Sequence, residues 1–402
     1  MKSIRGGLAV GALGGALVLM VAGCSSGGGK TAEGAPAGAP NATAAARPAV
    51  SAAVVSIEPA NGAADVKPSG ALKVSVAGGK LTTVKVTGPD GKEVPGALAA
   101  DGLSWLPADA LSVSSKYQVS AQAADAAGTV ATAESGFTTL TPAKEADPHD
   151  NIADNETYGV GMIVSLVFNK DVKEKAAVEK GVTFETSDGT VVKGHWFGDR
   201  RVDFRPEKYW KPGTKVTVRY RLKGVEISPG VYGGVDRDEP FSIGRSQIST
   251  ADMATDQMTV ERDGQAAETV PVTGGKPGFD TWNGTMVISE KYESTRMTSR
   301  GVTTPGSGDE YDIDDVPHAM RLTDSGTFVH GNYWGRGVFG KSNTSHGCVG
   351  ISDAKGGSDG SRAGTFFHSS LVGDVVTVVN SKSDKVRPDN GLSGWNLDWS
   401  AW

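Results

Sequence analysis

Short runs in which apolar and polar residues alternate recur along the chain from Val54 onward. In one of them, every second residue from Tyr117 to Ala123 is apolar, which is the period of a half-buried β-strand. Turn signals such as Pro89-Asp90-Gly91 separate these runs. Short strands with regular turns predict an antiparallel, immunoglobulin-like β-sandwich over residues 51–141.

Residues 142–247 look like a second copy of this segment. Pro107 matches Pro206 and Lys116 matches Lys215, both at an offset of 99 residues. An offset of about 100 residues fits one immunoglobulin-sized sandwich per copy, so we expect a second sandwich here. Neither segment gathers histidines, cysteines or carboxylates, and we therefore interpret both as spacer domains.

After residue 247 the pattern predicts a third, mostly β domain over residues 248–381, which makes the whole chain mainly β. Its first element is a hairpin with Asp263-Gly264 as the turn, and the apolar runs predict further strands in the segments 284–293, 327–334, 346–352 and 373–380. The end of the chain, residues 382–402, is rich in tryptophan. Three of these recur at helical spacing and are interpreted as a packing face: Trp395, Trp399 and Trp402.

The first residues predict export and lipidation. Two cations, Lys2 and Arg5, precede an apolar run that ends just before Cys24. This is the pattern of a secretory signal and not of a stable membrane span. The ending also resembles the lipobox of bacterial lipoproteins, in which the cysteine thiol takes the lipid, over residues 1–24. An ordinary signal peptide with an incidental Cys24 is the alternative. Residues 25–50, rich in Gly, Ala, Pro and Ser, predict a flexible tether.

The composition argues against one class of partner and leaves one cysteine without a partner for a disulfide. The formal net charge is −6 with no basic cluster, so we expect no nucleic-acid partner. The chain has two cysteines, and lipidation of Cys24 would leave Cys348 unpaired. An unpaired cysteine in an exported protein is a free reactive thiol or half of an intermolecular bridge. A structural zinc site would need several Cys or His at close spacing, so we expect none.

The residues around Cys348 suggest a nucleophile. A thiol reacts as its thiolate, and a histidine within hydrogen-bond reach can take its proton. His346 lies two residues earlier, so in an extended strand the two side chains would share a face. His330 belongs to another predicted strand and would meet the thiol across the fold. Gly347 would let backbone N–H groups turn toward a substrate oxygen. These residues alone also fit a buried, inert cysteine.

The segment "HGNYWGRGVFGKSNTSHGCVGIS" carries a more specific pattern. It resembles the signature of the L,D-transpeptidases with a YkuD-type catalytic domain: a histidine, a spacer, and then Ser/Thr-His-Gly-Cys. The order of lipoprotein signal, two immunoglobulin-like domains, catalytic domain and Trp-rich end is similar to that of the actinobacterial members. The resemblance covers nearly the whole chain after residue 24.

The resemblance implies a reaction on peptidoglycan stem peptides outside the cytoplasm, with the enzyme lipid-anchored to the outer face of the membrane. Cys348 would attack the third residue of a donor tetrapeptide, release D-alanine and form a thioester. An acceptor stem would then give a 3→3 cross-link. An L,D-carboxypeptidase with the same nucleophile is the first alternative, and a non-catalytic wall-binding scaffold is the second. The resemblance implies inhibition by carbapenems and calls for no metal or cofactor.

It also implies roles for individual residues. His330 would be the base, with its ring oriented by the backbone carbonyl of Gly331. His346 and the backbone of Gly347 would line the site and hold the oxyanion. In the family a tyrosine that precedes the base also serves the oxyanion, and Tyr311, nineteen residues before His330, is the match.

Two features of the segment leave the substrate contacts open. Trp334 and Tyr333 follow the base and would form the floor of the substrate groove or, equally, act as core aromatics. The family usually has Asn or Arg two residues after the cysteine, and this chain has Gly350. Either donor recognition would then differ, or Ser345 or Asn343 would compensate.

The remaining histidines are interpreted as structural or surface residues: His149, His195, His318 and His368. His318 is expected in a loop, and the acidic run "GDEYDIDD" that precedes it is expected to be a solvated lid.

Overall fold

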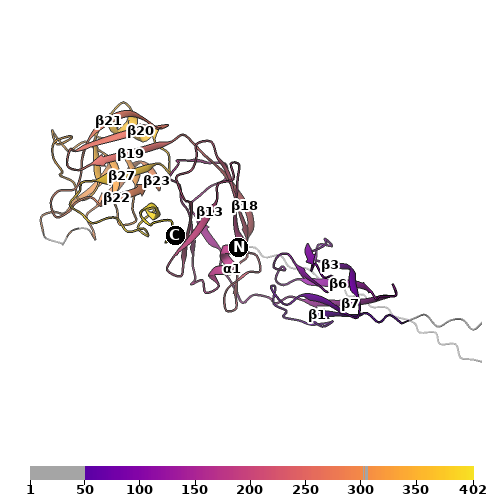
Figure 1. The fold of residues 1–402 in the computed structure, drawn as a ribbon. Coiled ribbons are helices and arrows are strands. Elements are labelled where there is room, and N and C mark those ends of the chain that lie inside the picture. The colour runs from indigo at the N-terminus through magenta and orange to yellow at the C-terminus, as the bar shows by residue number, and fades with distance from the viewer. Residues whose placement is uncertain (1–49, 302, 304–306) are drawn as a thin grey trace, which may run out of the picture. The chain divides into compact units, whose positions relative to one another are not determined.

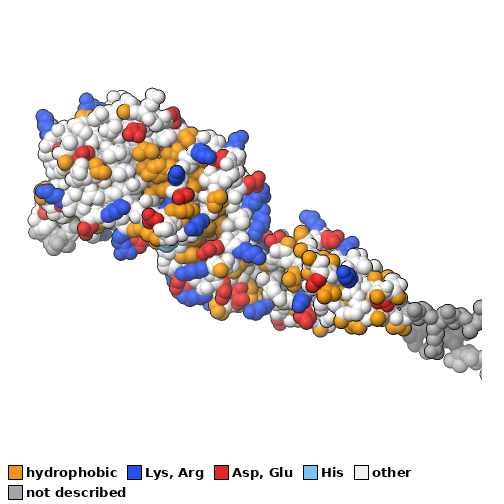
Figure 2. Space-filling view, in the orientation of Figure 1, with side chains coloured by type: hydrophobic (Ala, Val, Ile, Leu, Met, Phe, Trp, Pro, Cys, Tyr) orange, Lys and Arg blue, Asp and Glu red, His pale blue; other side chains and the backbone are white. Residues whose placement is uncertain are grey.

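The computed structural model describes residues 50–301, 303 and 307–402, so Cys24 and all but the last residue of the predicted tether lie outside the described residues. The described part is mainly β, as predicted. Within it, no helix combines the length and the hydropathy that a membrane span requires. On the face shown in Figure 2, acidic and basic side chains are interspersed.

The first sandwich contains a four-stranded and a three-stranded sheet (Figure 1). The four-stranded sheet has the order β1 (Val54–Glu58), β2 (Lys73–Ala77), β5 (Ser104–Pro107), β4 (Gly96–Leu98). The other has the order β3 (Lys80–Thr87), β6 (Lys116–Ala124), β7 (Val130–Thr138). The alternation read from the sequence is confirmed in β6, where each apolar residue from Tyr117 to Ala123 is buried.

The second sandwich contains two four-stranded sheets. One has the order β10 (Thr157–Tyr158), β18 (Asp236–Ile243), β15 (Lys215–Arg221), β12 (Val182–Thr186). The other has the order β13 (Val192–Phe197), β14 (Arg201–Pro206), β11 (Val164–Phe168), β9 (Pro148–Asp150). Helix α1 (Lys175–Gly181) and a small sheet complete it, with strands β16 (Glu226–Ser228), β17 (Val231–Tyr232) and β8 (Lys144–Glu145).

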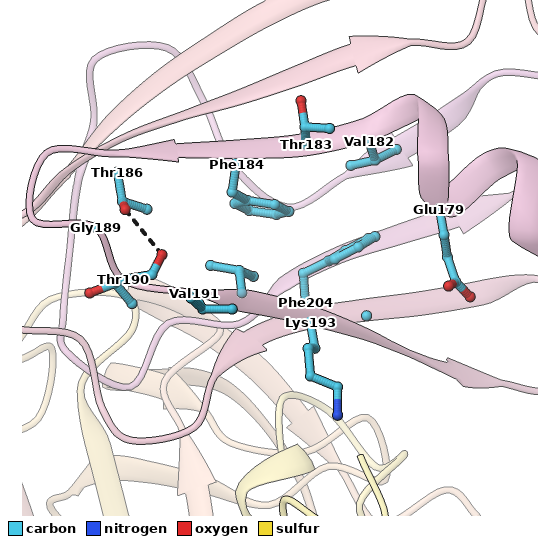
Figure 3. A pocket seen from close by; sticks show the side chains of 12 residues that line it. Glu179, Val182, Thr183, Phe184, Thr186, Gly189, Thr190, Val191, Lys193 and Phe204 are labelled. Carbon is cyan, nitrogen blue, oxygen red and sulfur yellow. Dashed lines mark hydrogen bonds between the residues drawn. The ribbon is translucent and has the colours of Figure 1, made fainter. Parts of the chain in front are cut away.

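The residues that suggested a repeat occupy corresponding strand ends in the two sandwiches. Lys116 begins β6 and Lys215 begins β15, while Pro107 ends β5 and Pro206 ends β14. The second sandwich also has a hollow of about 690 Å³ between β12 and β13, with the rings of Phe184 and Phe204 inside it (Figure 3). Its lining includes neither a histidine nor a cysteine, so we assign it no chemistry.

The third domain is built on one nine-stranded sheet (Figure 1). In spatial order its strands are β22 (Gly284–Val287), β27 (Val375–Val379), β19 (Gln247–Asp252), β20 (Gln257–Arg262), β21 (Gln265–Thr273), β26 (Val349–Ser352), β25 (Phe328–Asn332), β24 (Asp312–Arg321) and β23 (Glu290–Thr298). The predicted hairpin is confirmed as β20 and β21, and its turn residues have positive φ, 50° at Asp263 and 79° at Gly264.

The sheet curls back on itself. The run expected as one strand over 284–293 divides into β22 and β23 at residues 288–289, and these two strands lie at opposite ends of the strand order. Helix α2 (Arg362–Ser369) covers one face and buries Phe366 and Phe367. The resulting core holds β25 and β26 in fixed register. Strand β25 contains His330, and β26 begins directly after Cys348.

The three C-terminal tryptophans pack on the second sandwich, but they do not lie on the continuous helix that their spacing suggested. Only a single 3₁₀ turn forms, η1 (Gly394–Asn396). The buried guanidinium of Arg205 lies 4.7 Å from the ring centroid of Trp395, 5.3 Å from that of Trp399 and 4.2 Å from that of Trp402. Cation–π contacts thus replace the expected helical face.

Candidate active site

The candidate nucleophile and base meet on two neighbouring parallel strands. In the register of β25 and β26, Val329 pairs with Val349 and His330 with Gly350, which brings His330 next to the end of β26 that follows Cys348. Both residues line one pocket of about 450 Å³. Its other lining residues are Met297, Tyr311, Ile313, Val316, Asn332, Trp334, Gly335, Arg336, Val338, Thr344, Ser345 and His346.

The strand expected over 346–352 begins only at Val349, so the expectation that His346 and Cys348 share one strand face is wrong. Gly347 has a φ of 111°, which takes the backbone out of the extended conformation. Ser345 secures the turn with its hydroxyl, which accepts from the N–H of Gly347 at 3.2 Å and donates to the carbonyl of Cys348 at 2.6 Å. The thiol therefore projects from a tight turn at the head of β26.

The Cys348 thiol is buried and unpaired. Its S–H points at the backbone carbonyl of Gly326, with 3.6 Å between Sγ and the oxygen. Burial raises the pKa of the thiol to about 11, against a smaller lowering by the backbone of Phe328. At neutral pH the resting residue is therefore a thiol and not a thiolate.

His330 is held as a neutral base. Its Nδ1 lies 2.9 Å from the carbonyl oxygen of Gly331, and because a carbonyl only accepts, Nδ1 carries the proton and Nε2 the lone pair. Burial lowers the pKa of His330, while the bond to Gly331 acts in the opposite direction. The ring of Trp334 stacks on the imidazole at 5.7 Å. Across the described ranges, no hydrogen bond joins the imidazole to the Cys348 thiol.

Two aromatic rings enclose His346, 4.8 Å away at Phe279 and 4.9 Å away at Tyr311. Its Nε2 is buried and has no hydrogen-bond partner among the described residues. Burial, and next the charge of Lys276, lower the pKa of His346. The ring is therefore neutral at pH 7, with a polar nitrogen that a ligand in the pocket could satisfy.

The phenol of Tyr311 is another polar group that lines the pocket. Burial, and next negative charge on Cys348, together raise the pKa of its hydroxyl to about 12. The phenol thus stays protonated over the physiological range, and it lies close enough to the thiol to sense its charge. Its hydroxyl is a hydrogen-bond donor, and the residue lines the same pocket as Cys348.

Two residues proposed from the sequence are not brought to the pocket. The amide of Asn343 accepts from the backbone N–H of Gly274 at 2.6 Å and donates to the carbonyl of Met253 at 2.8 Å. The hydroxyl of Tyr333 donates to Asp315 at 2.6 Å. Both side chains fix loops around the site, because their polar atoms are already engaged with the protein.

The sequence reading missed Asn332, which is buried and lines the pocket. Its Oδ1 accepts from the backbone N–H groups of Trp334 and Gly335, at 3.1 and 2.7 Å. A Cβ placed on Gly350 would lie 3.3 Å from its Nδ2. The signal was present in the sequence, since a residue two positions after His330 on a strand faces the same side.

The comparisons with known proteins agree with this geometry. Residues 246–378 match the L,D-transpeptidase catalytic domain family (YkuD), and residues 63–226 match a bacterial Ig domain family. L,D-transpeptidase 2 of Mycobacterium tuberculosis (strain CDC 1551 / Oshkosh) is 32% identical over 342 residues, or 85% of this chain and 82% of that protein. The chain belongs to the L,D-transpeptidase family. It is by this membership a cysteine-dependent transpeptidase that acts at the cell wall, outside the cytoplasm.

Other L,D-transpeptidases show the same relationship. L,D-transpeptidase 5 of M. tuberculosis (strain ATCC 25618 / H37Rv) is 29% identical over 355 residues, which cover 87% of this chain and 76% of that protein. A solved structure of the transpeptidase LdtMt1 in complex with imipenem aligns with 60% of this chain and 100% of its own, with 29% identity and a TM-score of 0.49.

Proposed function

We propose that this transpeptidase forms 3→3 cross-links between peptidoglycan stem peptides through a thioester on Cys348. The observation that carries the proposal is that Cys348 and His330, from two adjacent parallel strands, line one pocket. Trp334 and Asn332 on the same wall are the groups we assign to the donor stem. Family membership supports the substrate class.

The first half-reaction transfers the donor peptide to the enzyme. Nε2 of His330 takes the thiol proton as sulfur attacks the carbonyl carbon of the third stem residue. The hydroxyl of Tyr311 and the backbone N–H of Cys348 stabilise the oxyanion. The C–N bond to the terminal D-alanine then breaks, and the imidazolium returns the proton to the leaving amine. The product is a Cys348 thioester and free D-alanine.

The second half-reaction regenerates the thiol. The side-chain amine of the third residue in an acceptor stem loses a proton to His330 and attacks the thioester carbonyl. The C–S bond breaks, sulfur takes the proton back, and an amide links the two stems. Because burial lowers the pKa of His330, the ring is neutral and ready to accept a proton at the start of each half-reaction.

Incubation with purified disaccharide-tetrapeptide, followed by mass spectrometry, tests the reaction. We expect D-alanine release and dimers with a 3→3 link, and neither product from Cys348→Ser. Trimming to tripeptide without dimers would replace the proposal with an L,D-carboxypeptidase. No product, together with no carbapenem adduct on intact protein, would indicate the wall-binding scaffold. A single adduct that is lost in Cys348→Ser supports the nucleophile.

The two sandwiches and a lipid on Cys24 would set where the reaction occurs. We assign residues 1–24 to the lipoprotein signal, 25–50 to the tether, 51–141 and 142–247 to spacer domains, 248–381 to catalysis and 382–402 to packing. A Cys24→Ala protein should leave the membrane fraction and lack a lipidated N-terminal peptide by mass spectrometry. An unlipidated Cys24 in the wild type would refute the anchor.

A further inference from the structure

A second cluster of titratable side chains lies outside the Cys348 pocket, around His318. The loop expected there from the sequence is wrong, because His318 is a residue of β24 that is only 3% exposed. Its φ is 48°, a left-handed conformation that is uncommon for residues other than glycine.

One carboxylate fixes the proton on the His318 ring. Oδ2 of Asp353 lies 2.7 Å from Nδ1 of His318. Its other oxygen, Oδ1, accepts from the backbone N–H groups of Ala354 at 2.7 Å and Ser358 at 3.1 Å. Since this carboxylate accepts from every neighbour, Nδ1 is the donor. In the neutral ring Nε2 then carries the lone pair.

Three more polar side chains lie around the His318 ring: Glu293, His368 and Asp359. Glu293 on β23, His318 and His368 on α2 each place one possible ligand atom so that all three lie within 4.8 Å of one another. Oδ1 of Asp359 lies 3.8 Å from Nε2 of His318 and 3.0 Å from Nε2 of His368. Two imidazole rings and two carboxylates, of which only His318 is buried, thus bring together the donor types that bind a divalent cation.

We propose that His318, His368 and Glu293 bind a divalent transition-metal ion of the zinc type, with Asp359 as the fourth ligand. Imidazole and carboxylate are zinc donors. A histidine ligand whose other nitrogen donates to a buried carboxylate, as His318 does to Asp353, is the arrangement found around bound zinc. Tetrahedral ligands stand roughly 3.4 Å apart, so the exposed Glu293 and His368 need to close in by roughly 1 Å.

The ligands would tie three elements together: edge strand β23, its neighbour β24 and helix α2. The partner of His318, Asp353, also lies against the catalytic strand, because a Cβ on Gly331 would be only 2.2 Å from its Oδ2. The carbonyl of Gly331 orients His330. The ion would therefore support the backbone that holds the base. No local pattern in the sequence indicates this site, because the four ligands are spread from residue 293 to residue 368.

Zinc binding to tag-free protein tests the site. Cys24 and Cys348 are both replaced by Ser so that no thiol competes, and zinc is titrated against a chromophoric chelator. We expect one ion per chain, and cobalt in its place should show the visible spectrum of tetrahedral coordination. His368→Gln and Glu293→Gln, both at exposed positions, should weaken binding about tenfold or more, and Asp353→Asn by about tenfold.

The matched control is His149→Gln, because His149 is an exposed histidine of β9 in the second sandwich. It should bind zinc as the parent does. Circular dichroism confirms that His318→Gln is folded before its affinity is compared. No zinc binding by the parent protein would overturn the proposal. Equal binding by the parent, His368→Gln and Glu293→Gln would overturn it as well.

Discussion

The carboxamide of Asn332 fills the space that a side chain at Gly350 would need. A Cβ on Gly350 would lie 3.3 Å from Nδ2 of Asn332 and 2.9 Å from Cγ2 of Thr273. The family pattern has Asn or Arg two residues after the cysteine, on β26. Here the polar group comes from β25, two residues after the base. The pocket thus still contains a side-chain amide, but the amide belongs to β25 and not to β26.

Replacing Asn332 should impair donor recognition. Asn332→Ala removes an amide whose loss costs about 1.5 kcal/mol, or about tenfold in kcat/KM for the tetrapeptide donor. Gly350→Asn alone should also lose activity because it collides with Asn332 and Thr273. The double variant Asn332→Ala/Gly350→Asn should recover part of the loss, because it removes the collision with the Asn332 amide while the contact with Cγ2 of Thr273 remains. Steady-state kinetics of D-alanine release measure all three, and a double variant no better than either single one would contradict the exchange.

The free enzyme should react slowly with thiol reagents at neutral pH. Burial raises the pKa of Cys348 to about 11, and a raised thiol pKa means that the reactive thiolate appears only as the pH climbs toward that value. Alkylation by iodoacetamide should therefore accelerate about tenfold per pH unit from pH 7 toward pH 11. His330→Gln should keep this profile yet abolish turnover, because no hydrogen bond joins the two side chains in the described structure. A rate that is already flat from pH 7 upward would instead show a preformed thiolate–imidazolium pair.

Gly331 is required for its small size as well as for its carbonyl. A Cβ there would lie 2.2 Å from Oδ2 of Asp353, so Gly331→Ala must shift the backbone that accepts from Nδ1 of His330. We expect kcat to fall by about tenfold with little change in KM, since proton transfer suffers while the pocket wall remains. The matched control is Gly360→Ala, where the added methyl meets no atom within 4 Å. Equal kinetics for the two variants would argue against this role.

Most strands and turns could be predicted from local patterns in the sequence. Period-two burial in β6 and the Asp263-Gly264 turn depend on neighbours in the chain, so the sequence was enough to predict them. The start of β26 was misplaced because the φ of Gly347 depends on a tertiary setting in which Ser345 binds both sides of the turn. Asn343 was assigned to substrate for a similar reason, because its partners Gly274 and Met253 are distant in sequence.

The site was predictable as far as its signature extends. Cys348, His330 and His346 lie within one segment, and Tyr311 stands one residue beyond the spacing expected in the family. Three contacts could not be read from any spacing: the carbonyl of Gly326 beneath the thiol, the carboxylate of Asp353 behind Gly331, and the ring of Phe279 against His346. In each case the curl of the sheet brings the contacting group to the motif, and the contact does not follow from a fixed spacing in the sequence.

Replacement of Trp402 should affect only the stability of the fold, and replacement of Trp334 only the rate of acylation. Trp402 is 7% exposed, contacts the Arg205 guanidinium and donates from Nε1 to the carbonyl of Lys193 at 2.9 Å. Trp402→Ala should lower the free energy of unfolding by about 3 kcal/mol, seen as a lower urea midpoint, while the rate of carbapenem acylation stays unchanged. Trp334 is 41% exposed and stacks on His330, so Trp334→Ala should slow acylation and leave the midpoint in place.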